Sequence, residues 1–330
     1  MITLVRMHSL LLTLTIILMA GAAAAIEPAS APAVGLVNLS AANFRRNPAH
    51  SAELVTQASF GTPVAVIEDR GNWLLTELPD GYRAWVDRPA ISLMSPDMMN
   101  RWRNSSRLIV TSMSEIHALT DTLAGQVPDN VVSDLVLGSI VEGVMPDAGT
   151  RFAAVSFPDG RCGYVDSWAV RPFKTWSEGI YDPQAILSVA YSLMGVPYLW
   201  GGTTTKGVDC SGLVKVAFFA SGLILPRDAA QQATCGIAVD HSTPHLFQPA
   251  DLLFFSPEDD RKSTRITHVG IYDNDSLYVH ASGSVRVNGF NPSGARYIDR
   301  PVKRAVRIAL PGRELPGTIR VAEHPWYFNR

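Results

Sequence analysis

The stretch Val208-Asp209-Cys210-Ser211-Gly212-Leu213-Val214-Lys215 lies where a glycine-rich turn passes into an apolar run. The apolar residues that follow Cys210 recur at helical spacing as far as Gly222, so residues 210–221 are predicted to form a helix with the cysteine in its first turn. Unpaired N–H groups and partial positive charge at a helix N-terminus favour a thiolate, so this position is predicted to lower the pKa of the cysteine. The stretch therefore predicts a nucleophilic sulfur at a helix start.

Two histidines follow the cysteine in two short runs that are rich in β-forming residues. His268 lies near the start of the run 267–272, and His280 lies near the end of the run 277–282, with the polar turn 273–276 between them. Two such runs joined by a polar turn predict a hairpin, on which both histidines can face the same side. A thiolate nucleophile needs a base and a group that orients the base, so Cys210, His268 and His280 are predicted to form a catalytic set.

Residues 180–310 resemble the NlpC/P60 family of papain-like cysteine peptidases, which cleave bacterial cell-wall peptides. The resemblance is carried by five motifs that stand in the family's order, namely Pro197-Tyr198-Leu199-Trp200-Gly201-Gly202, Asp209-Cys210-Ser211-Gly212-Leu213, Leu225-Pro226-Arg227-Asp228-Ala229-Ala230-Gln231-Gln232, Asp251-Leu252-Leu253-Phe254-Phe255 and the two histidine strands. The resemblance implies an α+β fold with helices on an antiparallel sheet. It also implies a peptidase without a cofactor.

Composition and cysteine count exclude several other classes. The chain has 330 residues, of which 47% are hydrophobic and 18% charged, and its formal net charge is −2, so it has no basic excess for nucleic acid. Its three cysteines form no close pair and no zinc-type cluster, so no metal site is predicted. Cys162 and Cys235 either form a bridge or are buried small residues, and we favour the second interpretation.

The first 25 residues have the pattern of a secretory signal peptide. A basic residue, Arg6, precedes the apolar run Leu10–Met19, and the small residues 21–25 follow it. The apolar run is shorter than the ~20 residues that a membrane-spanning helix needs, so no stable membrane anchor is expected. The pattern predicts an exported protein, either periplasmic or extracellular at the cell wall, whose mature chain begins near Ile26.

Two consecutive segments are predicted to form small β-barrels. Residues 34–94 show short apolar alternations separated by turn signals, and their motifs resemble a bacterial SH3-like domain. Residues 105–172 repeat the pattern more weakly, most clearly where 157–165 echoes 78–86. A connecting helix is predicted over 96–103. Both barrels can be interpreted as wall-binding or spacer modules that take no part in catalysis. The family resemblance instead implies that the first barrel helps to close the catalytic cleft.

The peptidase domain is predicted to begin with a helix at Asp182-Pro183, because Asp is a good N-cap and Pro is favoured at the first helical position. Its buried stripe is predicted to comprise Ala185, Ile186, Val189, Ala190 and Leu193. The predicted architecture is therefore a signal peptide (1–25), two SH3-like β-barrels (34–94 and 105–172), an α+β papain-like domain (180–310) and a tail of unassigned role (311–330).

The family resemblance assigns roles around the nucleophile. Cys210 attacks the scissile amide, His268 exchanges the proton, and His280 orients His268. The backbone N–H of Cys210 is a donor to the oxyanion by its position, and Tyr198 matches a family tyrosine that assists it. Packing alone explains Tyr198 about equally well.

Further residues are predicted to bind substrate. Asp209 would raise the pKa of a neighbouring cysteine, so we expect it either to cap the helix or to bind the free α-amine of an N-terminal L-Ala. Arg227 and Asp228 resemble the Arg-Asp pair of peptidases that cut after γ-D-glutamate, and arginine suits the free α-carboxylate of that residue. Ala229 departs from the hydroxyl residue that relatives often have there. The remaining substrate-binding candidates are Ser211, Tyr82 and Glu53.

These observations predict an exported cysteine endopeptidase that hydrolyses the amide between γ-D-glutamate and a diamino acid in peptidoglycan stem peptides, especially those with a free N-terminal L-Ala. Two alternatives stay open. The domain could act on intact wall, or be an amidase or acyltransferase of the same fold. A non-catalytic wall-binding protein built on the barrels is the other alternative, and the Cys210, His268 and His280 set argues against it.

Overall fold

A computed structural model describes residues 33–123, 130–179, 181–260, 262–310, 313–314 and 316–329. The predicted signal peptide, residues 1–25, lies outside the described residues. Within the described part of the chain, no helix has the length and apolar character needed to cross a membrane.

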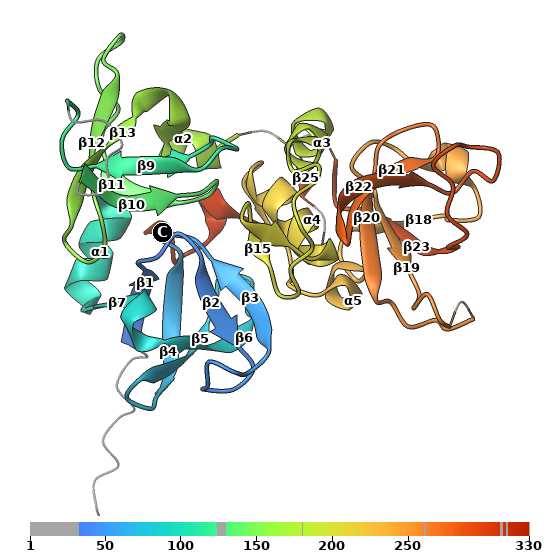
Figure 1. Cartoon of the computed structure of the whole chain (residues 1–330), viewed down its shortest axis with the longest axis horizontal. Helices are drawn as coiled ribbons and strands as arrows, with labels where there is room; N and C mark the ends of the chain where they lie inside the picture. Colours follow the sequence, from blue (N-terminus) through green and yellow to red (C-terminus); the bar gives the residue numbers. More distant parts are fainter. Residues whose placement is uncertain are drawn as a thin grey trace, which may run out of the picture. The chain divides into compact units, whose positions relative to one another are not determined.

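The first sheet, drawn in blue in Figure 1, has seven strands in the order β3-β2-β6-β5-β4-β1-β7. Its elements are β1 (Ala33–Val37), β2 (Ala42–Arg45), β3 (Leu54–Ala58), β4 (Pro63–Asp69), β5 (Trp73–Glu77), β6 (Arg83–Asp87), the short 3-10 helix η1 (Arg88–Ala90) and β7 (Ile91–Met94). Alternate residues of these strands face a common core that contains Phe44, Val64, Leu74 and Val86. Helix α1 (Pro96–Asn104) follows, and Ser95 caps it by accepting a hydrogen bond from Met98 N, as a helix over 96–103 requires.

The second sheet repeats the strand order of the first. Its seven strands run β10-β9-β13-β12-β11-β8-β14, which is the first order with every number raised by seven. Its elements are β8 (Arg107–Val110), β9 (Ile116–Leu119), β10 (Val131–Leu135), β11 (Ile140–Gly143), β12 (Phe152–Ser156), β13 (Cys162–Asp166), the 3-10 helix η3 (Ser167–Ala169) and β14 (Val170–Pro172). Helix α2 (Phe173–Ser177) ends this part of the chain. The identical order gives the sequence repeat a structural counterpart.

The third part is built on a six-stranded antiparallel sheet of order β18-β23-β19-β20-β21-β22. Its strands are β18 (Ile237–Val239), β19 (Leu252–Phe255), β20 (His268–Tyr272), β21 (Leu277–Ser282), β22 (Ser284–Gly289) and β23 (Val302–Arg307). Its remaining elements are α3 (Pro183–Ser192), β15 (Thr203–Thr204), β16 (Gly207–Val208), α4 (Cys210–Phe219), β17 (Leu223–Ile224), α5 (Ala229–Gln232) and the 3-10 helix η4 (Pro244–Leu246). Helix α4 packs on α3 and on strands β20 and β21.

Neighbouring residues of these strands serve two separate cores. Leu252 and Phe254 of β19 belong to the core that α4 completes. Leu253 and Phe255 belong to an aromatic core on the other side, together with Tyr278. This is the alternation expected of strands that are buried on both faces. An α+β papain-like arrangement of helices on an antiparallel sheet results, as the sequence predicted.

Two local predictions need correction. In α3, Ala185 is exposed, whereas Leu187 is buried beside Ile186, because the buried stripe is shifted by part of a turn. Cys235 is buried, but Cys162 is exposed on β13, since the strand turns this position toward solvent. Both cysteines are free thiols in the structure.

The segment after the peptidase sheet, to which the sequence assigned no role, packs between the other parts. It contains β24 (Ala309–Leu310), β25 (Arg313–Glu314), β26 (Ile319–Arg320) and the 3-10 helix η5 (Val321–Glu323), and β26 pairs with β17. Tyr327 is buried in a cluster that draws on both seven-stranded sheets, α1, α2 and β17. Residues 319–328 therefore join all three parts of the chain.

Candidate active site

The nucleophile candidate occupies the first position of α4. Asp209 is the N-cap, and its Oδ1 accepts the backbone N–H of Gly212 at 2.7 Å. The backbone N–H groups of Ser211 and of Val269, the residue after His268 on β20, are near enough to the Cys210 sulfur to lower its pKa. The helix start therefore meets the strand that carries the predicted base.

The pKa of Cys210 moves in the direction opposite to the sequence prediction. Burial of the side chain, followed by the negative charge of Asp209, raises the pKa to about 11, and the two backbone N–H groups and Arg227 offset this only in part. N–H groups at the helix start favour the thiolate, but the depth of burial disfavours this charged form more strongly. The free enzyme therefore holds Cys210 as a neutral thiol at neutral pH.

His268 and His280 form a direct hydrogen bond, with 2.7 Å between Nε2 of His268 and Nδ1 of His280. The other nitrogen of His280, Nε2, lies 2.8 Å from Oδ1 of Asn288 on β22. The side-chain amide of Asn288 is oriented by its own donation to the carbonyl of Arg296 at 3.2 Å. The three side chains thus form a chain that leads away from the base.

Neutral rings fix the proton positions in this chain. Because Oδ1 of Asn288 only accepts, His280 carries its proton on Nε2 and has a lone pair on Nδ1. His268 then donates from Nε2 to that lone pair, which leaves its Nδ1 as the basic nitrogen. Burial holds the pKa of His268 well below its usual 6.5, with smaller contributions from His280 and Arg300. Burial also lowers the pKa of His280, to about 4.

Asn288 was missed by the sequence analysis. The tight turn at Gly283 is the sequence feature that could have predicted it. This turn pairs His280 with Arg286, so Asn288, two positions further along β22, lies on the same face of the sheet as His280. Arg300 was missed as well. It lies over the Phe255 ring and pairs with Glu258, and its charge lowers the pKa of both histidines.

A cavity of about 280 Å³ opens beside Cys210. All the residues that the sequence predicted to bind substrate line this cavity. Besides Cys210, the lining residues are Arg46, Glu53, Val55, Tyr82, Tyr198, Trp200, Asp209, Ser211, Arg227, Asp228, Ala229, Ala230, Ile266 and Thr267. Glu53 directly precedes β3 and Tyr82 directly precedes β6, so this part of the chain forms one wall of the cavity. Among the described residues, no group of His, Cys, Asp and Glu side chains could hold a metal ion.

Asp209 and Arg227 bind each other instead of pointing freely into this cavity. Their buried ion pair has two contacts, one of them 3.2 Å between Nη1 and Oδ1. Asp209 also accepts the N–H groups of Gly201 and Gly212, and Arg227 donates from Nη1 to Ser211 Oγ and from Nε to the carbonyl of Val55. The helix-cap interpretation of Asp209 is correct, and the arginine has little capacity left for a substrate carboxylate.

The other predicted residues are more accessible. Asp228, at the start of α5, is exposed as a whole residue. Neighbouring groups nevertheless remove part of the water around its carboxyl group, and this partial burial is the largest cause that raises its pKa. Glu53 accepts the indole N–H of Trp200 at 2.8 Å and pairs with Arg46, which lowers its pKa. Burial raises the pKa of Tyr198, and the nearby Cys210 and Asp209 raise it further, so its hydroxyl stays a donor.

A helix-start cysteine packed on an antiparallel sheet with two bonded histidines is the arrangement of a papain-like cysteine peptidase. Residues 195–306 match the NlpC/P60 family, and residues 44–91 match the bacterial dipeptidyl-peptidase Sh3 domain. The chain belongs to the NlpC/P60 family and is a peptidase. The match to the SH3 domain covers the first sheet only, so an SH3 assignment of residues 105–172 stays a prediction.

Curated relatives and a solved structure extend this result. The chain is 30% identical to dipeptidyl-peptidase 6 of Lysinibacillus sphaericus over 78% of this chain and 91% of that protein. It is 26% identical to the gamma-D-glutamyl-L-lysine dipeptidyl-peptidase of Bacillus cereus over 73% of this chain and 72% of that protein. The crystal structure of an NlpC/P60 family protein from Bacillus cereus matches 83% of this chain and 99% of its own with a TM-score of 0.69 and 20% identity, which shows the same fold.

Proposed function

We propose that the chain is an exported cysteine endopeptidase that hydrolyses the amide between γ-D-glutamate and a diamino acid in peptidoglycan stem peptides. The observation that carries the proposal is the helix-start Cys210 beside β20, with His268, His280 and Asn288 in one hydrogen-bonded chain. The name of the Bacillus cereus relative, gamma-D-glutamyl-L-lysine dipeptidyl-peptidase, supports the bond that we propose. Export rests on the sequence of residues 1–25.

The mechanism starts from a neutral thiol and a neutral imidazole. As the sulfur attacks the carbonyl carbon of the γ-D-glutamyl amide, Nδ1 of His268 accepts the thiol proton, and the lone pair of His280 stabilises the resulting imidazolium. The backbone N–H of Cys210, which has no partner within its helix, and the hydroxyl of Tyr198 donate to the oxyanion. His268 then returns the proton to the leaving amine, and water hydrolyses the thioester.

We propose that the part of the chain around the first sheet closes one end of the cleft, and that the free amine of an N-terminal L-Ala binds there. Asp209 was predicted as a candidate for this role, but its carboxylate already binds Arg227 and two backbone N–H groups. Asp228 and Glu53 are the other carboxylates that line the cavity, and Tyr82 lines it as well. We therefore assign the substrate ammonium to these three side chains.

The test incubates the purified chain with the tripeptide L-Ala-γ-D-Glu-diaminopimelate, with and without Cys210→Ala, and identifies the products by mass spectrometry. We expect L-Ala-γ-D-Glu and free diaminopimelate from the wild type and no turnover from the variant. Undiminished turnover by Cys210→Ala overturns the mechanism. Release of peptides from intact wall, or transfer to an amine acceptor with the tripeptide left uncut, would support the alternative activities of this fold instead.

The same assay with the N-acetylated tripeptide tests recognition of the amine. A carboxylate without its ammonium partner in a closed site costs several kcal/mol, so we expect acetylation to lower kcat/KM by about 100-fold. Equal values for the two peptides would refute recognition of the free amine.

A further inference from the structure

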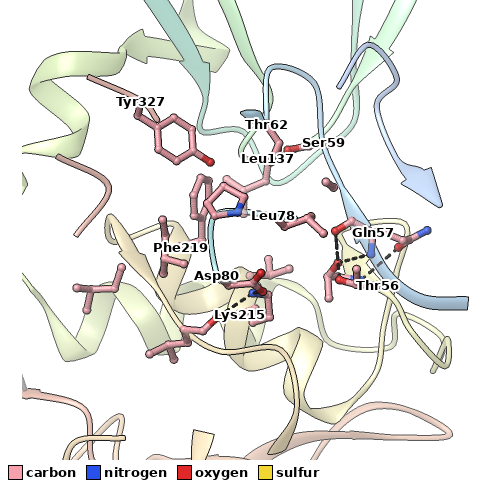
Figure 2. A pocket seen from close by; sticks show the side chains of 17 residues that line it. Thr56, Gln57, Ser59, Thr62, Leu78, Asp80, Leu137, Lys215, Phe219 and Tyr327 are labelled. Atoms are coloured by element: carbon pink, nitrogen blue, oxygen red, sulfur yellow. Dashed lines mark hydrogen bonds and ion pairs between the residues drawn. The ribbon is translucent and has the colours of Figure 1, made fainter. Parts of the chain in front are cut away.

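Behind the nucleophile helix lies a second cavity, of about 100 Å³, which does not include Cys210 (Figure 2). Its wall is mostly apolar but carries an ion pair between Lys215 of α4 and Asp80 of the β5–β6 turn. The side chains are 17% and 5% exposed, respectively. Charges this far from water are retained only when their partners are close and well oriented, so this pair is a defined contact between the first sheet and α4.

The Asp80 carboxylate accepts hydrogen bonds from two different segments of the chain. Its Oδ1 accepts the backbone N–H of Tyr82 at 3.0 Å, and its Oδ2 accepts a hydrogen bond from Nζ of Lys215. Tyr82 lines the wall of the active-site cavity. Lys215 is five residues after Cys210 on the same helix, or about 7.5 Å along its axis. One carboxylate therefore couples the position of Tyr82 to that of the nucleophile helix.

The Lys215 ammonium makes a second contact, to the carbonyl of Leu225 at 2.8 Å. Leu225 lies three residues before Asp228, which lines the active-site cavity together with Tyr82. The ammonium thus binds the segments that carry Tyr82 and Asp228, while its own helix carries Cys210. On the far side of the turn, Nε2 of His324 bonds to the carbonyl of Pro79 at 3.0 Å, which holds the turn from behind.

We propose that Lys215 and Asp80 are positioning residues that set the distance between the amine-binding side chains and the Cys210 sulfur, and so determine specificity for a free N-terminus. The inference rests on the proposed function. A substrate that is held at its amine presents its scissile bond at a fixed distance from that amine. A displacement of about 1 Å between the two ends of the cleft is therefore enough to lower the rate by about 100-fold.

The variants Asp80→Asn and Lys215→Met test this contact. Asparagine keeps an oxygen for the Tyr82 N–H but removes the charge, and methionine keeps most of the aliphatic stem but removes the ammonium. We expect each to reduce the preference for the free over the N-acetylated tripeptide, measured as a ratio of kcat/KM values, by at least about tenfold. Alkylation of Cys210 by iodoacetamide should change by less than about twofold, since the nucleophile itself is untouched.

Two further variants serve as controls. Lys215→Arg keeps a cation within reach of Asp80 and should retain most of the wild-type ratio. Arg83→Met removes the exposed ion pair with Glu77 on the same hairpin and should leave the ratio unchanged. A wild-type enzyme without preference for the free amine overturns the proposed function and this inference together. If the wild type has the preference and folded Asp80→Asn or Lys215→Met keeps it in full, only the inference is overturned.

Discussion

The β5–β6 turn of the first sheet and the β12–β13 turn of the second have similar sequences and the same backbone conformation, but they pack against different surfaces. The first reads Leu78-Pro79-Asp80-Gly81-Tyr82 and the second Phe157-Pro158-Asp159-Gly160-Arg161. Both close through the same backbone hydrogen bonds, and both have a glycine with positive φ, +77° at Gly81 and +87° at Gly160. In each, the aspartate accepts the N–H of the residue two positions later.

The two turns differ in what packs against them. Asp80 meets Lys215 of the nucleophile helix, and Tyr82 lines the active-site cavity. Asp159 meets only its neighbour Arg161, whose guanidinium reaches the carbonyls of Val132 and Asn38 and lies over Phe157. Sequence determines the shape of this turn locally, whereas its role depends on the surface that it contacts.

The largest predicted difference is in catalysis. Tyr82→Ala removes a ring and a hydroxyl from the cavity wall, so we expect kcat/KM for the free-amine tripeptide to fall about 30-fold or more. Arg161→Ala changes the corresponding residue of the second turn and should alter kcat/KM less than twofold. Steady-state kinetics on both variants measure the comparison, and equal losses would mean that the second turn also serves the active site.

The two aspartates should differ in stability. Asp80→Asn leaves Lys215 without a charged partner in a mostly buried position, which we expect to lower the free energy of unfolding by about 3 kcal/mol. Asp159→Asn weakens a partly exposed pair within one turn and should cost less than about 1 kcal/mol. Denaturant titrations of both variants give the two values. A similar cost at both sites would contradict the difference in environment.

The two glycines should behave alike in stability. An added Cβ would meet no atom within 4 Å at either Gly81 or Gly160, so only the backbone strain of a positive φ remains. We expect Gly81→Ala and Gly160→Ala each to lower the free energy of unfolding by about 1 kcal/mol. Unequal losses in denaturant titrations would show that the local geometry of the turns differs after all.

The smallest predicted effect concerns the pH dependence of kcat/KM. The buried histidines determine this dependence, and neither turn should change it. Activity requires neutral His268 and His280, and burial lowers both of their pKa values, that of His280 to about 4. Protonation therefore occurs at lower pH than for a free imidazole, and kcat/KM at pH 6 should stay within about twofold of its value at pH 7. The wild type and Arg161→Ala should give the same profile, whereas a fall centred near pH 6.5 would contradict the buried pair.

Local signals in the sequence predicted much of this architecture. The caps Ser95, Asp182 and Asp209 mark the starts of α1, α3 and α4. Of the two histidine strands, β21 has the predicted bounds 277–282, and β20 begins at His268, one residue after the predicted start at Thr267. These features depend on neighbours a few residues away, so spacing and residue type are enough to find them.

The contacts that the sequence did not predict join distant residues. Lys215 and Asp80 are 135 positions apart, and His324 and Pro79 are 245 apart, so no periodicity links them. The pairing of Asp209 with Arg227 is nearer, but each side chain also had a plausible substrate partner. The direction of the Cys210 pKa was wrong for a related reason, because burial is decided by the packing of the whole sheet.

The packing of residues 319–328 has a consequence for the order of events during synthesis. Translation proceeds from the N-terminus, so this segment is made after both seven-stranded sheets and the peptidase sheet that it joins. Until it emerges, Tyr327 is missing from the central cluster and Pro79 lacks its bond to His324. The nascent chain can form its separate cores, but the turn that carries Tyr82 is held from both sides only after residues 319–328 have been translated.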